Sequence, residues 1–279
     1  MRADGGGRIL PWMSGIFRHP LRVAWRLAKF LAVNTRGLAE HAGSLRRRGL
    51  AADPAACSVW LHKYAAANLA AIGFRFDQTG EVPTRGMIVS NHLSYLDIAV
   101  LAATGRMVFV SKAEVASWPL LGSLARCGGT LFLKREQRSH VAEIAGAFRP
   151  IIEGGTVVTI FPEGTSSGGG EVLPFRPSLL EPAASNGWPV TPAWLTYEID
   201  PDEGTLSDDV AYWRDMTFAP HFLNLLAKRS IRARVFYGDP VAGISDRKEL
   251  ARRLHAGVCA LRSRHGGAGR SAAPGLTNL

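Results

Sequence analysis

"MIVSNHLSYLDIAVLAATGRMVFVSK", residues 87–112, holds the pattern that decides the fold. Two short apolar, β-branched runs, each suited to a buried strand, enclose a helical stretch over residues 95–103. Four more such runs follow within residues 129–135, 156–164, 189–195 and 232–238, and helical stretches at 118–126, 140–153, 220–228 and 246–264 lie among them. This alternation predicts an α/β fold with a mostly parallel sheet that helices cover on both faces.

The composition indicates a folded protein with an anionic partner. The 279 residues are enough for one large core, and 47% of them are hydrophobic. The net charge of +10 favours nucleic acid or membrane lipid as the partner. Three distant cysteines, Cys57, Cys127 and Cys259, favour reduced thiols in a cytosol-facing protein. We expect neither secretion nor a spanning anchor, because the sequence has no signal-peptide pattern and no apolar run of about 18–20 residues.

Two helices are predicted ahead of the alternating region. The first begins at Pro20 and places Arg22, Arg26 and Lys29 on one narrow stripe, with Trp25 beside them and a wide apolar face opposite. This arrangement is typical of a helix lying in an anionic membrane interface, and the alternative is an amphipathic helix packed on a core. The second helix follows an Asp-Pro pair at residues 53–54 and ends at residue 73.

The chain should therefore have three parts. Residues 1–76 hold the two basic amphipathic helices for membrane attachment, and residues 77–265 form the α/β domain. Residues 266–279, rich in Gly and Ala, should form a disordered tail.

The turn after the first strand places His92 shortly before Asp97. Ser94 is the expected N-cap of the next helix, and Asp97 falls in its first turn. Asp97 can then accept a hydrogen bond from one imidazole nitrogen and leave the other free as a base. The alternatives are a metal site, for which no second ligand stands at the usual spacing, and a structural histidine beside a helix cap. Because the chain has no Gly-x-Ser-x-Gly sequence, a catalytic His92 would activate a hydroxyl of the substrate.

Three further stretches of sequence favour the catalytic interpretation of His92. Lys112 precedes a helix, Arg135 ends the next strand, and Glu163 and Thr165 follow the strand after that, where backbone N–H groups and a hydroxyl can hold a polar headgroup. With His92 they complete four blocks in a fixed order. The chain thereby resembles the 1-acyl-sn-glycerol-3-phosphate acyltransferase family over roughly residues 20–240. The blocks are His-x4-Asp at 92–97, Gly-x-x-Phe-x-x-Arg at 129–135, Phe-Pro-Glu-Gly-Thr at 161–165 and a Val-Pro-Val-x-Pro-like strand at 189–192.

The resemblance implies transfer of a fatty acyl group from acyl carrier protein or coenzyme A to a lysolipid hydroxyl. The first acceptor it implies is 1-acyl-sn-glycerol-3-phosphate, in membrane phospholipid biosynthesis. His92 would be the general base and Asp97 would orient it. The residues that would bind substrate are Lys112, Arg135, Glu163, Gly164, Thr165 and Arg176. The resemblance implies no metal or redox cofactor, and it implies a peripheral or monotopic protein at the cytoplasmic face of the bacterial inner membrane.

Two departures from the family pattern concern the acceptor. Ser166 stands where an arginine commonly follows Glu-Gly-Thr, and Pro177-Ser178 replaces a glycine-containing loop. A lyso-aminolipid such as lyso-ornithine lipid is therefore the alternative acceptor. Two other functional classes compete. A non-catalytic lipid-binding protein would gain nothing from an oriented His92, and nucleic-acid binding does not suit scattered basic residues without a known module.

Overall fold

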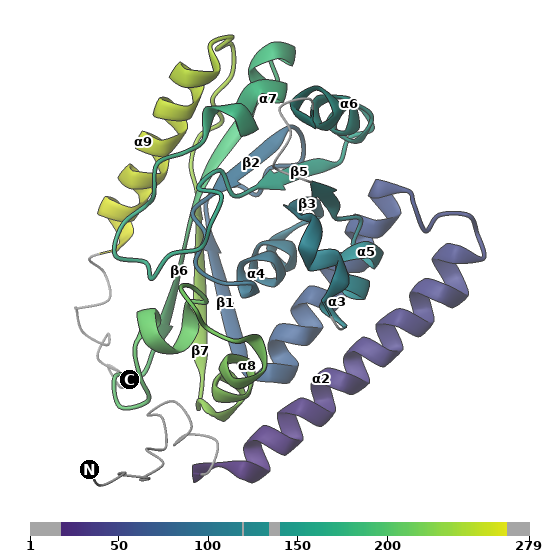
Figure 1. Ribbon diagram of the computed structural model, residues 1–279, viewed down its shortest axis with the longest axis vertical. Helices are drawn as coiled ribbons and strands as arrows, with labels where there is room; N and C mark the ends of the chain where they lie inside the picture. Colours follow the sequence, from purple (N-terminus) through teal and green to yellow (C-terminus); the bar gives the residue numbers. More distant parts are fainter. Residues whose placement is uncertain (1–17, 119, 134–139, 267–279) are drawn as a thin grey trace, which may run out of the picture.

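A seven-stranded sheet forms the centre of the molecule (Figure 1). The computed structural model describes residues 18–118, 120–133 and 140–266. Across the sheet the described strands run in the order β1-β7-β6-β2-β5-β3-β4, and each neighbouring pair is parallel except β6 with β7. The predicted mostly parallel sheet is thus confirmed. The strands are β1 (Phe74–Thr79), β2 (Met87–Ser90), β3 (Met107–Lys112), β4 (Leu131–Leu133), β5 (Val157–Ile160), β6 (Val190–Ile199) and β7 (Ile231–Tyr237).

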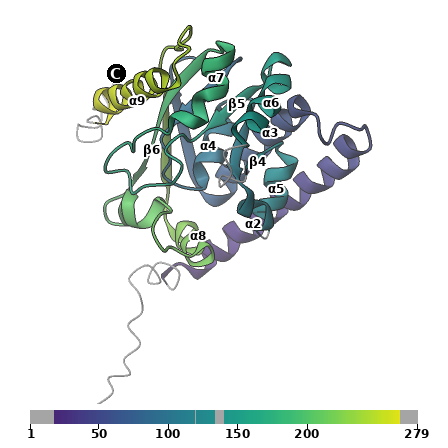
Figure 2. The same cartoon turned by 45° about the horizontal axis from the view of Figure 1, so that its top comes forward.

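Helices cover both faces of this sheet, as the strand–helix alternation predicts (Figures 1 and 2). The apolar core on one face joins the sheet to α2 (Pro20–Glu40), α3 (Pro54–Ile72), α4 (Leu96–Thr104) and α8 (Phe218–Ala227). The core on the other face includes α6 (His140–Glu153), α7 (Glu181–Asn186) and α9 (Arg247–His265). The shorter segments are η2 (His41–Arg46), η3 (Ala113–Ser117), α5 (Leu121–Cys127), η4 (Pro177–Leu180) and η5 (Leu206–Val210).

Strand β2 lies between β5 and β6, and its side chains supply both cores. Ile88 packs in the α3–α4 core, whereas Met87 and Val89 pack in the α6–α9 core, and all three are fully buried. Burial on both faces explains why β2 is a continuous apolar run without polar alternation. The turn that follows Ser90 is therefore held at the carboxyl edge of the sheet, between two neighbouring strands.

Strand β1 is absent from the sequence prediction. It begins directly after Gly73, which ends α3 in a left-handed conformation (φ 86°) that only glycine adopts without strain. Beyond Phe74 its side chains are partly or fully exposed, because β1 is an edge strand. Its pattern therefore lacks the apolar run by which the other strands are recognised. The expected division at residues 76 and 77 falls inside this strand.

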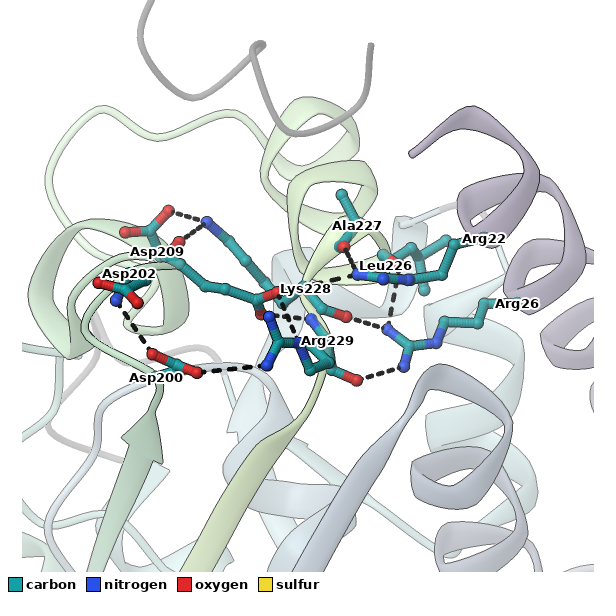
Figure 3. Close-up of polar contacts among 10 residues, drawn as sticks. Arg22, Arg26, Asp200, Asp202, Asp209, Leu226, Ala227, Lys228 and Arg229 are labelled. Carbon is teal, nitrogen blue, oxygen red and sulfur yellow. Dashed lines mark hydrogen bonds and ion pairs between the residues drawn. The ribbon is translucent and has the colours of Figure 1, made fainter. Parts of the chain in front are cut away.

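Two of the three basic side chains in the stripe on α2, Arg22 and Arg26, face the protein, so they are not free for charge-driven attachment to lipid. Carbonyl groups in the last turn of a helix lack intrahelical partners, and the guanidinium groups of Arg22 and Arg26 bind such carbonyls at the end of α8 (Figure 3). Arg22 donates to Ala227 O at 2.7 Å, and Arg26 donates to Leu226 O at 3.1 Å, to Arg229 O at 2.8 Å and also to Lys228 O.

The apolar side of α2 is divided. Val23 and Phe30 are buried against the core, whereas Leu21 is 85% exposed, Trp25 65% and Leu31 47%. Leu50 and Val59 are also exposed, so the large apolar side chains exposed on the described part of the chain all come from residues 21–59. None of the described helices is both long enough and apolar enough to span a bilayer.

Candidate active site

The candidate site lies where β2 and β5 end. In a parallel sheet such carboxyl ends share one edge, and the loops that follow them meet there. The loop after β5 is bound to the turn after β2, because Ser167 N donates to His92 O at 2.9 Å. The backbone thus brings together the His-x4-Asp block and the Phe-Pro-Glu-Gly-Thr block.

His92 and Asp97 form a hydrogen-bonded pair. The His92 Nδ1–Asp97 Oδ2 distance is 2.7 Å, and Asp97 is fully buried. Oδ2 also accepts the backbone N–H groups of Leu93 at 2.6 Å and Ser94 at 3.0 Å. These donors stabilise the carboxylate in a position without water. Asp97 therefore closes the turn with the same oxygen that binds the imidazole.

The expected N-cap role of Ser94 is wrong. Its hydroxyl is buried and has no hydrogen-bond partner among the described residues. Asp97 reaches back to the amides of the turn and replaces a side-chain cap, so the helix start depends on the same carboxylate.

The imidazole of His92 stacks on Phe161. The two ring centroids are 4.2 Å apart and the planes differ by 16°. This stacking and the Asp97 bond fix the ring in two directions. Because Asp97 engages Nδ1, Nε2 is the nitrogen that can accept a proton.

A cavity of about 370 Å³ begins at His92 and extends below α3 and α4. Its wall is mostly apolar, and includes side chains from α2, α3, α4 and α8 such as Phe30, Leu69, Ile98 and Phe222. The polar residues of the wall include Lys112, Gly164, Thr165 and Ser166, and the last three belong to the loop that is bound to the turn of His92. The space suits an extended apolar chain with a polar group at the histidine.

Glu163 lies outside this lining. Its side chain is 3% exposed, and its carboxyl group faces the backbone of His92 and Leu173. Burial, together with the nearby Asp97 carboxylate, raises the pKa of Glu163 to about 8. At neutral pH this group is therefore mostly a neutral carboxylic acid, able to donate a hydrogen bond.

Gly164 and Arg176 lie against each other. Gly164 has a φ of 77°, and a Cβ atom added there would lie 2.6 Å from Nε of Arg176. Arg176 is exposed and does not line the cavity. Lys112, at the end of β3, is exposed and lines it. Arg135 lies outside the described residues.

Ser166 has a local partner. Its hydroxyl donates to the carbonyl oxygen of Tyr212, and Tyr212 N donates to Leu93 O at 2.8 Å. The segment after η5 is thereby held against the turn of His92 from two sides. Ser166 thus joins two walls of the cavity.

Sequence reasoning missed an aromatic group beside this wall. Tyr95 lies near Tyr212 and Phe218, with ring centroids 5.2 and 5.0 Å apart, and its hydroxyl is 3.0 Å from His221 Nδ1. His221 Nε2 lies 3.1 Å from Ala211 O, and burial lowers the pKa of His221 to about 4. A neutral His221 that donates from Nε2 accepts a hydrogen bond from the Tyr95 hydroxyl at Nδ1. No spacing in the sequence indicates this contact, because Tyr95 and His221 are 126 residues apart.

Sequence reasoning also left Tyr197 without a role. Its hydroxyl donates to Asp97 Oδ1 at 2.6 Å. The alternation along β6 could have found it, because Tyr197 follows Ala193 and Leu195 on one face, beyond the end of β2.

Comparisons with known proteins agree with this geometry. Residues 73–196 match the Acyltransferase family. A lyso-ornithine lipid O-acyltransferase of Rhodobacter capsulatus is 36% identical over 198 residues, covering 68% of this chain and 71% of that protein. One of Pseudomonas aeruginosa is 33% identical over 243 residues, covering 85% and 92%. A 1-acyl-sn-glycerol-3-phosphate acyltransferase of Neisseria meningitidis is 34% identical over 117 residues, covering 42% and 46%.

The fold has a solved counterpart. The crystal structure of the 1-acyl-sn-glycerophosphate (LPA) acyltransferase PlsC from Thermotoga maritima superposes with a TM-score of 0.62 and 18% identity, covering 93% of this chain and 100% of that one. At this identity the likeness concerns the fold.

Proposed function

This chain belongs to the Acyltransferase family and is an O-acyltransferase, and we propose that it transfers a fatty acyl group from a thioester to the free hydroxyl of lyso-ornithine lipid. The observation that supports this best is the hydrogen-bonded His92–Asp97 pair at the polar end of an otherwise apolar cavity. The donor is acyl carrier protein or coenzyme A carrying the acyl chain. The reaction uses no metal or redox cofactor.

His92 acts as the general base in this proposal. Nε2 takes the proton of the acceptor hydroxyl as its oxygen attacks the thioester carbonyl, and Asp97 stabilises the imidazolium that forms. The tetrahedral intermediate then collapses, the C–S bond breaks, and the thiolate takes the proton from Nε2. Positioned proton transfer contributes typically about 10²- to 10⁴-fold, so orientation in the cavity must supply much of the remaining acceleration.

Ser166 fits an acceptor without a terminal phosphate. An arginine at position 166 would bind a phosphate monoester with two charge-assisted bonds, whereas Ser166 is bound to a carbonyl oxygen. Lyso-ornithine lipid has no phosphate group that would need a cationic partner. The long match to lyso-ornithine lipid O-acyltransferases supports the same choice.

Lysophosphatidate is the second candidate acceptor. Lys112 lines the cavity near His92, and the ammonium group could pair with a phosphate. Thr165 offers a hydroxyl from the same loop, and the exposed Arg176 lies against Gly164. Glu163, neutral at this site, would support the loop and hold the acceptor indirectly.

The exposed apolar face of α2 attaches the enzyme to its membrane in this proposal. Leu21, Trp25 and Leu31 project from the same side of the helix, while Arg22 and Arg26 hold the opposite side on α8. Insertion of such a face into the lipid headgroup boundary places the cavity where its two-chain product is soluble. We place the protein at the cytoplasmic face of the bacterial inner membrane, as a peripheral or monotopic enzyme.

A competition assay tests the proposal. Purified enzyme receives equal amounts of lyso-ornithine lipid and lysophosphatidate with one labelled donor, acyl carrier protein or coenzyme A thioester, and mass spectrometry identifies the labelled lipids. Label should enter ornithine lipid preferentially. If label enters phosphatidate alone, lyso-ornithine lipid is not the acceptor. If label enters neither lipid, the enzyme transfers acyl groups to neither lyso-ornithine lipid nor lysophosphatidate.

A further inference from the structure

The carboxylate of Asp97 has donors on both oxygens. Oδ2 is shared by the imidazole and two backbone N–H groups, and Oδ1 accepts the hydroxyl of Tyr197 at 2.6 Å. Among the described residues, Tyr197 is the hydrogen-bond donor to Oδ1. The side chains of both residues are buried, with 0% exposure for Asp97 and 3% for Tyr197. The hydrogen bond between the phenol and Asp97 is therefore shielded from solvent.

The sheet fixes where the phenol lies. Strand β6 pairs with β2 in parallel as far as Ser90, which lies opposite Ala193. Beyond this point β6 continues to Ile199, whereas the segment after β2 turns toward His92. The side chain of Asn91 completes the ladder, donating to Leu195 O at 2.9 Å and accepting Leu195 N at 2.8 Å. Tyr197, two residues further on the same face, reaches Asp97 from a rigid strand.

The phenol is a permanent donor. Burial raises the pKa of Tyr197 well above its usual value, and the nearby Asp97 carboxylate raises it further. The other titratable groups beside the pair are Glu163, from the loop after β5, and Tyr95, from the turn. Unlike these two, Tyr197 donates a hydrogen bond directly to Asp97.

We propose that Tyr197 is a positioning residue for acyl transfer, completing a His92–Asp97–Tyr197 chain of hydrogen bonds. This inference rests on the proposed function, in which His92 is the base. The phenol holds Oδ1 so that Oδ2 stays in line with the imidazole, and it withdraws part of the carboxylate charge from His92. Without it, Asp97 stabilises the imidazolium more strongly, and a larger share of the enzyme holds a protonated, inactive base at a given pH.

The test compares Tyr197→Phe with Tyr237→Phe. Tyr237 is a matched control, because it is buried on the neighbouring strand β7 and its hydroxyl lies 2.7 Å from Thr104 Oγ1, away from Asp97. The acid limb of kcat/KM against pH should move to higher pH by roughly half a unit or more in Tyr197→Phe. It should not move in Tyr237→Phe, since a loss of packing alone lowers the rate without displacing the limb.

A second variant of the enzyme keeps the hydroxyl at position 197 and makes it a stronger hydrogen-bond donor. Substituting 3-fluorotyrosine at position 197 makes the phenol more acidic, so the limb should move to lower pH. This protein decides the matter if Tyr197→Phe does not fold. An unmoved limb in the fluorinated enzyme overturns the inference, as does an equal shift in Tyr237→Phe.

His92→Ala separates this inference from the proposed function. An inactive His92→Ala enzyme together with an unmoved limb means that Tyr197 has only a structural role, and the function stands. An active His92→Ala enzyme means that His92 is not the base, so the mechanism on which this inference rests is wrong, whereas failure of acyl transfer by the wild-type enzyme in the competition assay would overturn the proposed function.

Discussion

Replacing Arg26 with methionine should loosen α2 from α8 and lower the free energy of unfolding by about 2–4 kcal/mol. Arg26 donates to three carbonyl groups at the end of α8 (Figure 3). A hydrogen bond from a charged donor contributes roughly 1.5–3 kcal/mol. The three bonds share one half-buried side chain, and water can reach some of the freed carbonyls, so the effect should be well below their sum. Methionine keeps much of the apolar stem.

Urea unfolding followed by circular dichroism measures this loss. Lys29→Met is the matched control, since Lys29 lies on the same helix and its removal also deletes one positive charge. Its ammonium group lies 5.6 Å from the Trp25 ring centroid, a contact worth about 0.5–1 kcal/mol at an exposed site. If Arg26→Met costs no more than Lys29→Met, the contacts with α8 do not stabilise the protein and the assigned role of Arg26 is wrong.

Three further changes have defined outcomes. Ser166→Arg should raise the share of label entering phosphatidate in the competition assay, whereas Ser166→Ala, which only removes the hydroxyl, should not; equal shares in all three enzymes would exclude this position as a selector. Glu163→Gln should flatten the fall of stability with pH. Because the pKa of this carboxyl rises from 4.5 to about 8 on folding, the free energy of unfolding falls as the pH rises between these values, by roughly 1.4 kcal/mol per pH unit at most. Parallel curves of stability against pH for the wild type and the variant would contradict this. Leu21→Glu with Trp25→Glu should release the enzyme from sedimented anionic vesicles, while Ala256→Glu, at an exposed position of α9, should not. Continued binding of the double variant would place the attachment elsewhere.

The sheet was predictable because its central strands are buried on both sides. Met87, Ile88 and Val89 form a continuous apolar run for that reason, and the helices between the runs fix the parallel order. Strand β1 was not predictable by the same rule. It lies at the edge, and only Phe74 of its six residues is buried.

The proximity of His92 and Asp97 was predictable because it is local. A turn followed by a helix start places the two side chains within reach regardless of the remaining fold, and the observed distance is 2.7 Å. The partners that reach this pair from a distance were not predictable. Tyr197 is 100 residues away from Asp97 in sequence, and its role depends on how far β6 extends past β2.

The partners of the basic stripe on α2 were not predictable for a related reason. Arg22, Arg26 and Lys29 form one stripe in either environment, so periodicity alone cannot tell a lipid headgroup from the carbonyl groups of another helix. The carbonyl groups of α8 lie about 200 residues further along the chain, and they are the partners of Arg22 and Arg26.

Acyl transfer by His92→Ala tests the central claim most directly. Wild-type and variant enzyme, matched for circular dichroism and thermal midpoint, receive lyso-ornithine lipid and a labelled acyl thioester in excess. The rate of labelled ornithine lipid formation should fall by about 10²- to 10⁴-fold in the variant, the usual contribution of a positioned base. A folded His92→Ala enzyme that forms product at close to the wild-type rate would contradict the assignment of His92 as the base.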